Sequence, residues 1–167
     1  MEDQLKDALP QGFADDSRVW IYLSNRKFTP EENLSINGML EEFTRQWNSH
    51  GTPVKGYGGT LYAQFILLMA DENATGVSGC STDSSVRLIK EIEKKFGVEM
   101  FNWQSLAFLK DGKVSLLPLP ALQEKVNEGA IAPETLFFNN TVPDLSALKS
   151  GWIIPVKESW LMKRVSF

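Results

Sequence analysis

The chain has 167 residues, of which 43% are hydrophobic and 23% charged, and it contains one cysteine and one histidine. This composition is that of an ordinary globular protein and excludes disordered, collagen-like and disulfide-stapled classes. One cysteine and one histidine cannot supply the ligands of a structural zinc site or an iron–sulfur cluster, so we expect no bound metal and no cofactor.

The net charge of −4 lies entirely in the first sixteen residues, and the rest of the chain is neutral. We expect residues 1–16 to form an acidic, solvated N-terminal arm and residues 17–167 to form a single domain. A neutral body does not attract phosphate backbones, so no nucleic acid is expected as a partner. The longest apolar run, Phe65 to Ala70, is too short to span a bilayer, and no export signal is recognisable. We therefore expect a cytoplasmic protein without membrane insertion.

The first part of the domain predicts strands separated by a helix. Val19–Leu23 is a short run of β-branched and aromatic residues, which favours a strand. Thr29–Glu32 has the spacing of a capping box with proline at the first helical position, so a helix begins there. Residues 52–57 predict an edge strand, Gly58-Gly59 a tight turn, and Leu61–Met69 a long buried strand.

The second part predicts another long helix and a hairpin. The helix begins near Ser81 or Thr82 and ends at Gly97, and Asp111-Gly112 is a strong signal for a turn between two strands, 106–109 and 114–117. Beyond these, the sequence predicts a helix over 121–128, a strand over 136–138, a turn at Asn139-Asn140-Thr141, a helical turn over 144–149, an extended segment over 152–154 and a short helix over 160–162. The five tryptophans are expected in the core.

The order of these elements indicates a fold class. Strand, helix, strand, strand, helix, strand is the βαββαβ order of a ferredoxin-like sheet, in which the first and third strands are central and the second is an edge. The first and third predicted strands are the most apolar, whereas the second contains Pro53. We therefore expect an α+β protein whose ferredoxin-like core spans 17–117, with an added hairpin strand and a C-terminal α/β extension over 118–167.

A ligand site is most readily placed at the start of the second long helix. Small polar residues open this helix, and an N-terminus with free N–H groups can hold an anion. The structural alternative is that Ser81, Thr82 or Asp83 only caps the helix. We hypothesise that loops leaving the two central strands join this helix start, so that a small anionic or polar ligand is bound by Asn25, Arg26, Asp71, Cys80, Ser81, Thr82 and Asp83.

These residues favour a non-enzymatic module that binds a small ligand or another protein. The alternative is a Cys80-dependent enzyme or a redox-sensitive protein, since a thiolate is stabilised at a helix N-terminus. The only histidine, His50, is predicted far from Cys80, which removes the usual basic partner of a nucleophilic thiol. Exposed sheet edges would permit a homo-oligomer.

Several runs of the chain together resemble a known family: 19–26, 65–72, 78–86, 138–140 and 154–160. The sequence is similar there to a family of short bacterial proteins often labelled "ABC transporter ATPase", and the resemblance implies ATP hydrolysis. A P-loop requires Gly-Lys-Ser or Gly-Lys-Thr after a glycine-rich turn. The chain contains neither tripeptide and no Leu-Ser-Gly-Gly-Gln signature, so its residues predict no ATP hydrolysis.

Overall fold

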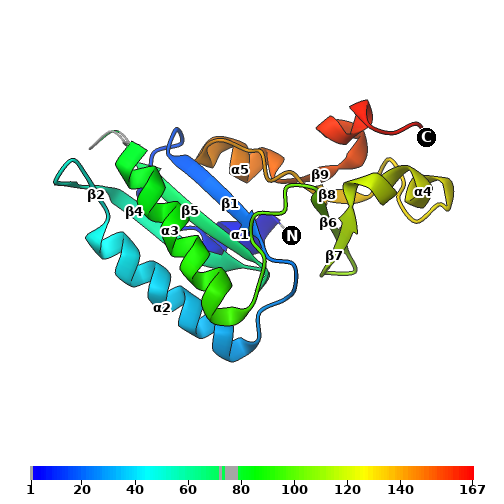
Figure 1. Cartoon of the computed structure of the whole chain (residues 1–167). Coiled ribbons are helices and arrows are strands. Elements are labelled where there is room, and N and C mark those ends of the chain that lie inside the picture. The colour runs from blue at the N-terminus through cyan, green and yellow to red at the C-terminus, as the bar shows by residue number, and fades with distance from the viewer. Residues whose placement is uncertain (1, 72, 74–78) are drawn as a thin grey trace.

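The computed structural model describes residues 2–71, 73 and 79–167, with only the backbone of residues 2–4 and 79–81 (Figure 1). It contains helices and two larger antiparallel sheets, so the α+β class predicted from the sequence is confirmed.

The first sheet has three antiparallel strands in the order β1 (Arg18–Leu23), β5 (Phe65–Asp71) and β4 (Lys55–Leu61). Trp20 lies opposite Leu68 in the β1–β5 pair. Every residue of the central strand β5 is buried, which explains its continuous apolar sequence. The order matches the first three strands predicted from the sequence.

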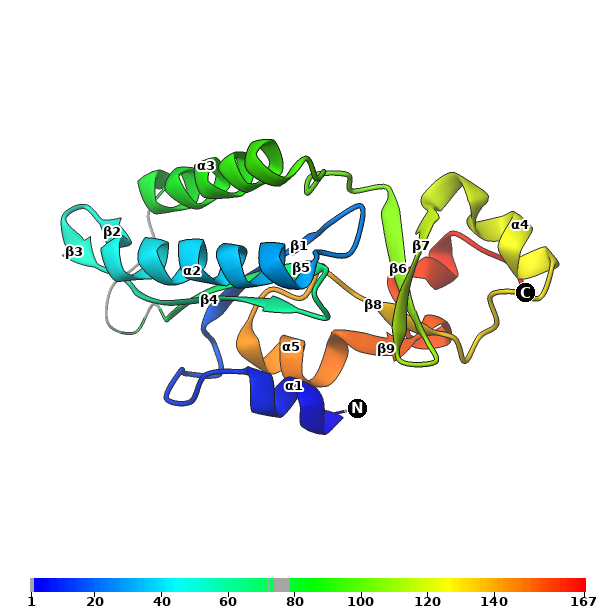
Figure 2. The same ribbon diagram turned by 90° about the horizontal axis from the view of Figure 1, so that it is seen from below.

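Helices cover both faces of this sheet (Figure 2). One face carries α2 (Pro30–Gln46) and α3 (Gly79–Phe96), and the other carries the shorter α1 (Glu2–Ala8) and α5 (Leu145–Gly151). The predicted capping box is confirmed, because the Thr29 hydroxyl accepts from Glu32 N while the Glu32 carboxylate accepts from Thr29 N.

The second sheet has the order β7 (Lys113–Pro118), β6 (Ser105–Lys110), β8 (Leu136–Phe138) and β9 (Ile153–Pro155). A complete ferredoxin-like sheet would place β6 beside β1, and that topology is not confirmed. β6 instead pairs with β7 on one side and β8 on the other. The free edge of β1 meets the segment before α5, where Val19 N donates to Pro143 O at 3.1 Å.

The remaining elements are short. They are the strands β2 (Asn48–Ser49) and β3 (Thr52–Pro53), the helix α4 (Leu122–Asn127), and the 3₁₀ turns η1 (Leu119–Ala121), η2 (Val156–Glu158) and η3 (Trp160–Lys163).

The two sheets share one hydrophobic core. Phe65 of the first sheet packs against Phe138 of the second, with ring centroids 4.7 Å apart, and against Trp152 at 5.1 Å. All three side chains are at most 1% exposed. The C-terminal extension therefore completes the core of the first sheet.

The N-terminal segment is part of this core and is not a solvated arm. Leu5 and Leu9 are each only 8% exposed and belong to the same cluster as Phe65. Tyr57 Oη donates to Ala8 O at 3.2 Å, which holds α1 to β4. The acidic charge of this segment predicts solvation, but Leu9 follows α1 directly and its N–H donates to Leu5 O at 3.1 Å, so the i,i+4 spacing places both leucines on the side that packs on the core.

The structural role of the β4 glycines also differs from the prediction, which placed a tight turn at Gly58-Gly59. Gly58 and Gly59 lie inside the strand, and the turn that follows is made by Tyr62 and Ala63, whose φ angles are 53° and 49°. A Cβ atom on Gly56 would lie 2.6 Å from the Trp47 ring, and one on Gly58 would lie 3.1 Å from Leu40 Cβ. Gly56 and Gly58 therefore allow α2 to pack closely on β4.

Candidate functional site

Arg26, one of the predicted ligand residues, is engaged in contacts within the protein. Its guanidinium nitrogens lie 2.8 Å from both carboxylate oxygens of Glu32 and 2.7 Å from Phe96 O. The Arg26 hydrogen bonds, together with the Thr29 backbone, lower the pKa of Glu32 to about 2. Arg26 thus joins the start of α2 to the end of α3.

Asn25 lies at the same end of the sheet and also has a structural partner. Its backbone N–H donates to Glu99 O at 3.0 Å, and its side-chain Oδ1 accepts from Glu99 N at 2.9 Å. This pair fixes the segment that follows α3 against the segment that follows β1.

Asp71 lies at the opposite end of the sheet. Its carboxylate accepts from Asn73 N at 3.0 Å and from Ala14 N at 3.3 Å, and Lys55 Nζ is 3.6 Å away. The hydrogen bond from Asn73 is the main cause that lowers the pKa of Asp71. Asp71 therefore attaches the N-terminal segment to the sheet.

The start of α3 lies far from Arg26. Helix α3 has 18 residues, which corresponds to about 25 Å, and Arg26 contacts its last residue, Phe96. Thr82 and Asp83 belong to the first turns, and Asp83 is exposed. The side chains of Cys80 and Ser81 lie outside the described residues.

The structure therefore does not bring the predicted site residues together. Because β1 and β5 are antiparallel, Leu23 at the end of β1 lies beside Phe65 at the start of β5. The loops that leave two antiparallel neighbours emerge at opposite ends of the sheet. Asn25 and Arg26 thus occupy one end, and Asp71 the other.

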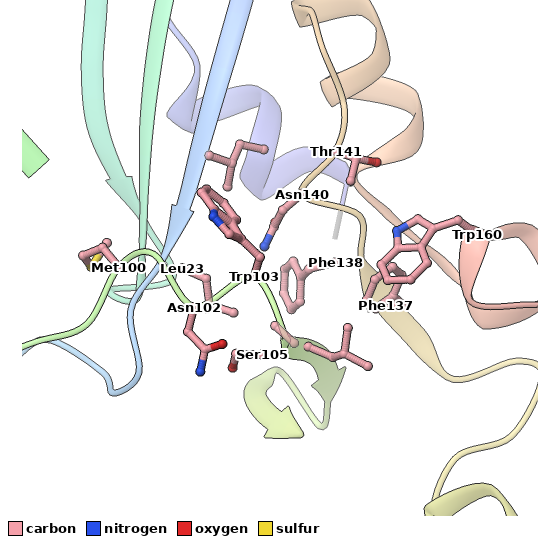
Figure 3. A pocket seen from close by; sticks show the side chains of 13 residues that line it. Leu23, Met100, Asn102, Trp103, Ser105, Phe137, Phe138, Asn140, Thr141 and Trp160 are labelled. Carbon is pink, nitrogen blue, oxygen red and sulfur yellow. The ribbon is translucent and has the colours of Figure 1, made fainter. Parts of the chain in front are cut away.

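A different site is formed where the two sheets meet. A cavity of about 180 Å³ lies between the end of β1, the segment 100–107 and the segment 137–141, with Trp160 of η3 at one side (Figure 3). Its walls are apolar over most of their surface, and its lining includes the rings of Phe137 and Phe138. An apolar cavity of roughly 150 Å³ is enough to hold benzene.

Asn140 supplies the best-defined polar group of this cavity. Its Oδ1 accepts a hydrogen bond from Trp152 Nε1 at 2.9 Å, which fixes the orientation of the amide. The amide nitrogen consequently points into the cavity, as Figure 3 shows. In the described part of the chain, Asn140 Nδ2 has no hydrogen-bond acceptor.

Trp160 supplies a second unpaired donor. Its Nε1 is buried and has no hydrogen-bond partner among the described residues. Figure 3 shows this nitrogen on the side of the indole ring that faces the other lining residues. A buried N–H group without an acceptor is unfavourable, so an acceptor from a ligand or water would stabilise it.

Trp103 forms the rim of the cavity and is the exception to the expectation that the tryptophans are core residues. Its side chain is 71% exposed. Phe101 packs edge-on against it with centroids 6.2 Å apart, and Tyr22 packs on Phe101 at 5.6 Å. An exposed indole held beside an apolar cavity offers a flat surface on which a ring can stack.

The chemistry of the lining is neutral. The lining contains no Asp, Glu, Lys, Arg, His or Cys side chain, so it offers no ionisable general acid or base, and the hydroxyls of Ser105 and Thr141 have no such base beside them in the lining. Nowhere in the described ranges do three or more His, Cys, Asp or Glu residues gather as a metal site would require. The arrangement is suited to binding.

Local sequence patterns contain little indication of this site. The turn predicted at Asn139-Asn140-Thr141 is confirmed, because Val142 N donates to Asn139 O at 3.4 Å and Thr141 N donates to Asn139 Oδ1 at 3.4 Å. The role of Asn140 depends on Trp152, twelve residues later, and could not be seen from the turn itself.

Comparisons with protein-family models, curated proteins and solved structures found no significant match to this chain. The resemblance to the short bacterial family stays a prediction, as do the cytoplasmic location and the formation of a homo-oligomer. Among the described helices, none combines the length and apolar character needed to cross a bilayer.

Proposed function

We propose that the protein binds a small, uncharged organic molecule in the cavity between its two sheets and does not transform it chemically. The observation that supports this most strongly is the cavity lining, which combines apolar walls with an oriented amide donor and has no ionisable side chain. Binding sites for small molecules typically have this combination of apolar walls and a few fixed polar groups.

The size of the cavity limits the ligand. A volume of about 180 Å³ is smaller than most sites for drug-sized molecules and accommodates one ring with a short substituent. A longer ligand would extend past the rim and contact Trp103, which is exposed there. The neutral lining disfavours an anion, because no cation is present to offset its desolvation.

A titration of the isotopically labelled protein with acetophenone, followed by amide NMR shifts, tests this function. We expect saturable shifts at Asn140 and at residues 100–107, with about millimolar affinity for so small a probe. The substitution Ser105→Phe places a ring in the cavity and should abolish binding, since Ser105 lines it.

Ser115→Phe is the matched control. Ser115 lies on β7 of the same sheet and is exposed, so the same change is made outside the cavity. Binding should be unchanged in this variant. Equal binding by the Ser105→Phe and wild-type proteins, or shifts confined to another surface, would contradict the proposed function.

A further inference from the structure

The cavity presents hydrogen-bond donors whose matching acceptors are missing. Asn140 Oδ1 already accepts from Trp152 Nε1, which fixes the amide so that its N–H groups are directed toward a ligand in the cavity. The buried Nε1 of Trp160 is a donor with no capacity to accept. Either group can therefore donate to an acceptor atom on whatever occupies the cavity.

The charge of the lining restricts which acceptor is suitable. Carboxylates and phosphates accept hydrogen bonds, but their desolvation is normally offset by Arg or Lys, and neither lines this cavity. A carbonyl oxygen is a strong acceptor that carries no net charge. It can satisfy an N–H donor without the cost of burying an ion.

The rings around the cavity restrict the shape of the ligand. Phe137 lies between Phe108 and Trp160, with ring centroids 5.6 Å and 5.9 Å away. Aromatic walls pack best against flat rings, in offset or edge-on arrangements. Trp103 adds an exposed ring at the rim.

We infer that the ligand belongs to the class of neutral aromatic carbonyl compounds, with its carbonyl oxygen accepting from Asn140 Nδ2 or Trp160 Nε1 and its ring packed against Phe137 and Phe138. This inference rests on the proposed function, because it names the chemical class for the same cavity. It goes beyond that function by assigning two donor atoms as determinants of specificity.

Three single-ring probes of similar size distinguish the proposed binding function from the inferred ligand class. Acetophenone carries a carbonyl, ethylbenzene has nearly the same shape without an acceptor, and benzoate carries a charge. We expect acetophenone to bind about tenfold more tightly than ethylbenzene, as one hydrogen bond to an otherwise unsatisfied donor would give. Benzoate should bind more weakly than acetophenone.

Two variants test the assigned donors. Asn140→Asp keeps an oxygen that can accept from Trp152 but removes the amide donor, and Trp160→Phe keeps a ring but removes the indole N–H. The preference for acetophenone over ethylbenzene should disappear in at least one variant, while the affinity for ethylbenzene should change less than twofold in that variant. Thermal unfolding of each variant checks that it is folded.

The possible outcomes are distinct. If none of the three probes binds in the cavity, both the proposed function and this inference are wrong. If ethylbenzene binds as tightly as acetophenone, or if benzoate binds best, the cavity is a binding site but the inferred ligand class is wrong. If both variants retain the preference for acetophenone, the assignment of the donors is overturned.

Discussion

Asn140 and Trp152 form a hydrogen bond of 2.9 Å that connects the core to the cavity. Trp152 is fully buried between the two sheets, and its indole N–H needs an acceptor there. Asn140 provides that acceptor and, as a consequence, directs its amide nitrogen into the cavity. One contact therefore satisfies a buried donor and orients the proposed binding group.

The first prediction concerns the stability that this contact provides. Asn140→Ala leaves Trp152 Nε1 without its acceptor and should lower the free energy of unfolding by about 1–3 kcal/mol. The same substitution in a Trp152→Phe background should cost clearly less, because no indole donor remains. Chemical denaturation of the four proteins in this double-mutant cycle measures the coupling. A coupling energy near zero would show that the hydrogen bond does not stabilise the fold.

The second prediction concerns the packing of α2 on β4. Gly56→Ala should destabilise the protein by about 1–3 kcal/mol, since the new methyl group would lie 2.6 Å from the buried Trp47 ring. Gly38→Ala is the matched control inside α2, where a Cβ meets nothing within 4 Å. It should stabilise the helix by about 0.5–1 kcal/mol. Urea unfolding of the two variants should therefore give changes in the unfolding free energy of opposite sign. Two changes of the same sign would show that Gly56 is not required for close packing of α2 on β4.

The third prediction concerns acid stability. The folded protein holds the pKa of Glu32 at about 2, below its ordinary value of 4.5, mainly through Arg26. A lowered pKa stabilises the folded state above pH 4.5, and this stabilisation is lost as the pH falls from 4.5 to about 2. Glu32→Gln preserves a capping-box side chain but removes the charge. The difference in unfolding free energy between wild type and Glu32→Gln should therefore become smaller as the pH is lowered from 4.5 to about 2.

Glu31→Gln is the control for that experiment. Glu31 is exposed and neighbours Glu32 in the first turn of α2, and no ion pair involves it in the described part of the chain. Its substitution should leave the pH profile nearly parallel to that of the wild type. A pH-independent difference for Glu32→Gln would contradict the proposed role of the Arg26–Glu32 pair.

The fourth prediction concerns nucleotides. The sequence contains one Gly-Lys dipeptide, Gly112-Lys113, and it lies at the β6–β7 turn, followed by Val114. No phosphate-binding loop of the P-loop type is therefore encoded. We expect no heat of binding in calorimetric titrations with ATP, with or without Mg²⁺. Saturable ATP binding would support the activity that the family resemblance implies.

Local features of the fold could be predicted because their causes lie within a few residues. The capping box at Thr29 and Glu32 depends on four consecutive residues, and the hairpin at Asp111-Gly112 depends on two residues whose φ angles are 51° and 73°. Both predictions are confirmed.

The remaining features depend on long-range geometry that local patterns do not contain, whereas the failure of the predicted ligand site does not. Neither the pairing of β6 with β8 nor the exposure of Trp103 follows from the neighbouring sequence. The antiparallel direction of β1 and β5, in contrast, follows from the βαββαβ order that the sequence predicted. That direction already places Arg26 and Asp71 at opposite ends of the sheet.

The most direct test of the binding site is a crystal structure of the protein soaked with acetophenone. We expect density for the probe in the cavity between the sheets, with its ring against Phe137 and Phe138 and its oxygen within hydrogen-bond distance of Asn140 Nδ2 or Trp160 Nε1. A cavity that stays free of the probe, while the probe occupies a different surface, would contradict the proposal that this cavity binds a small neutral molecule.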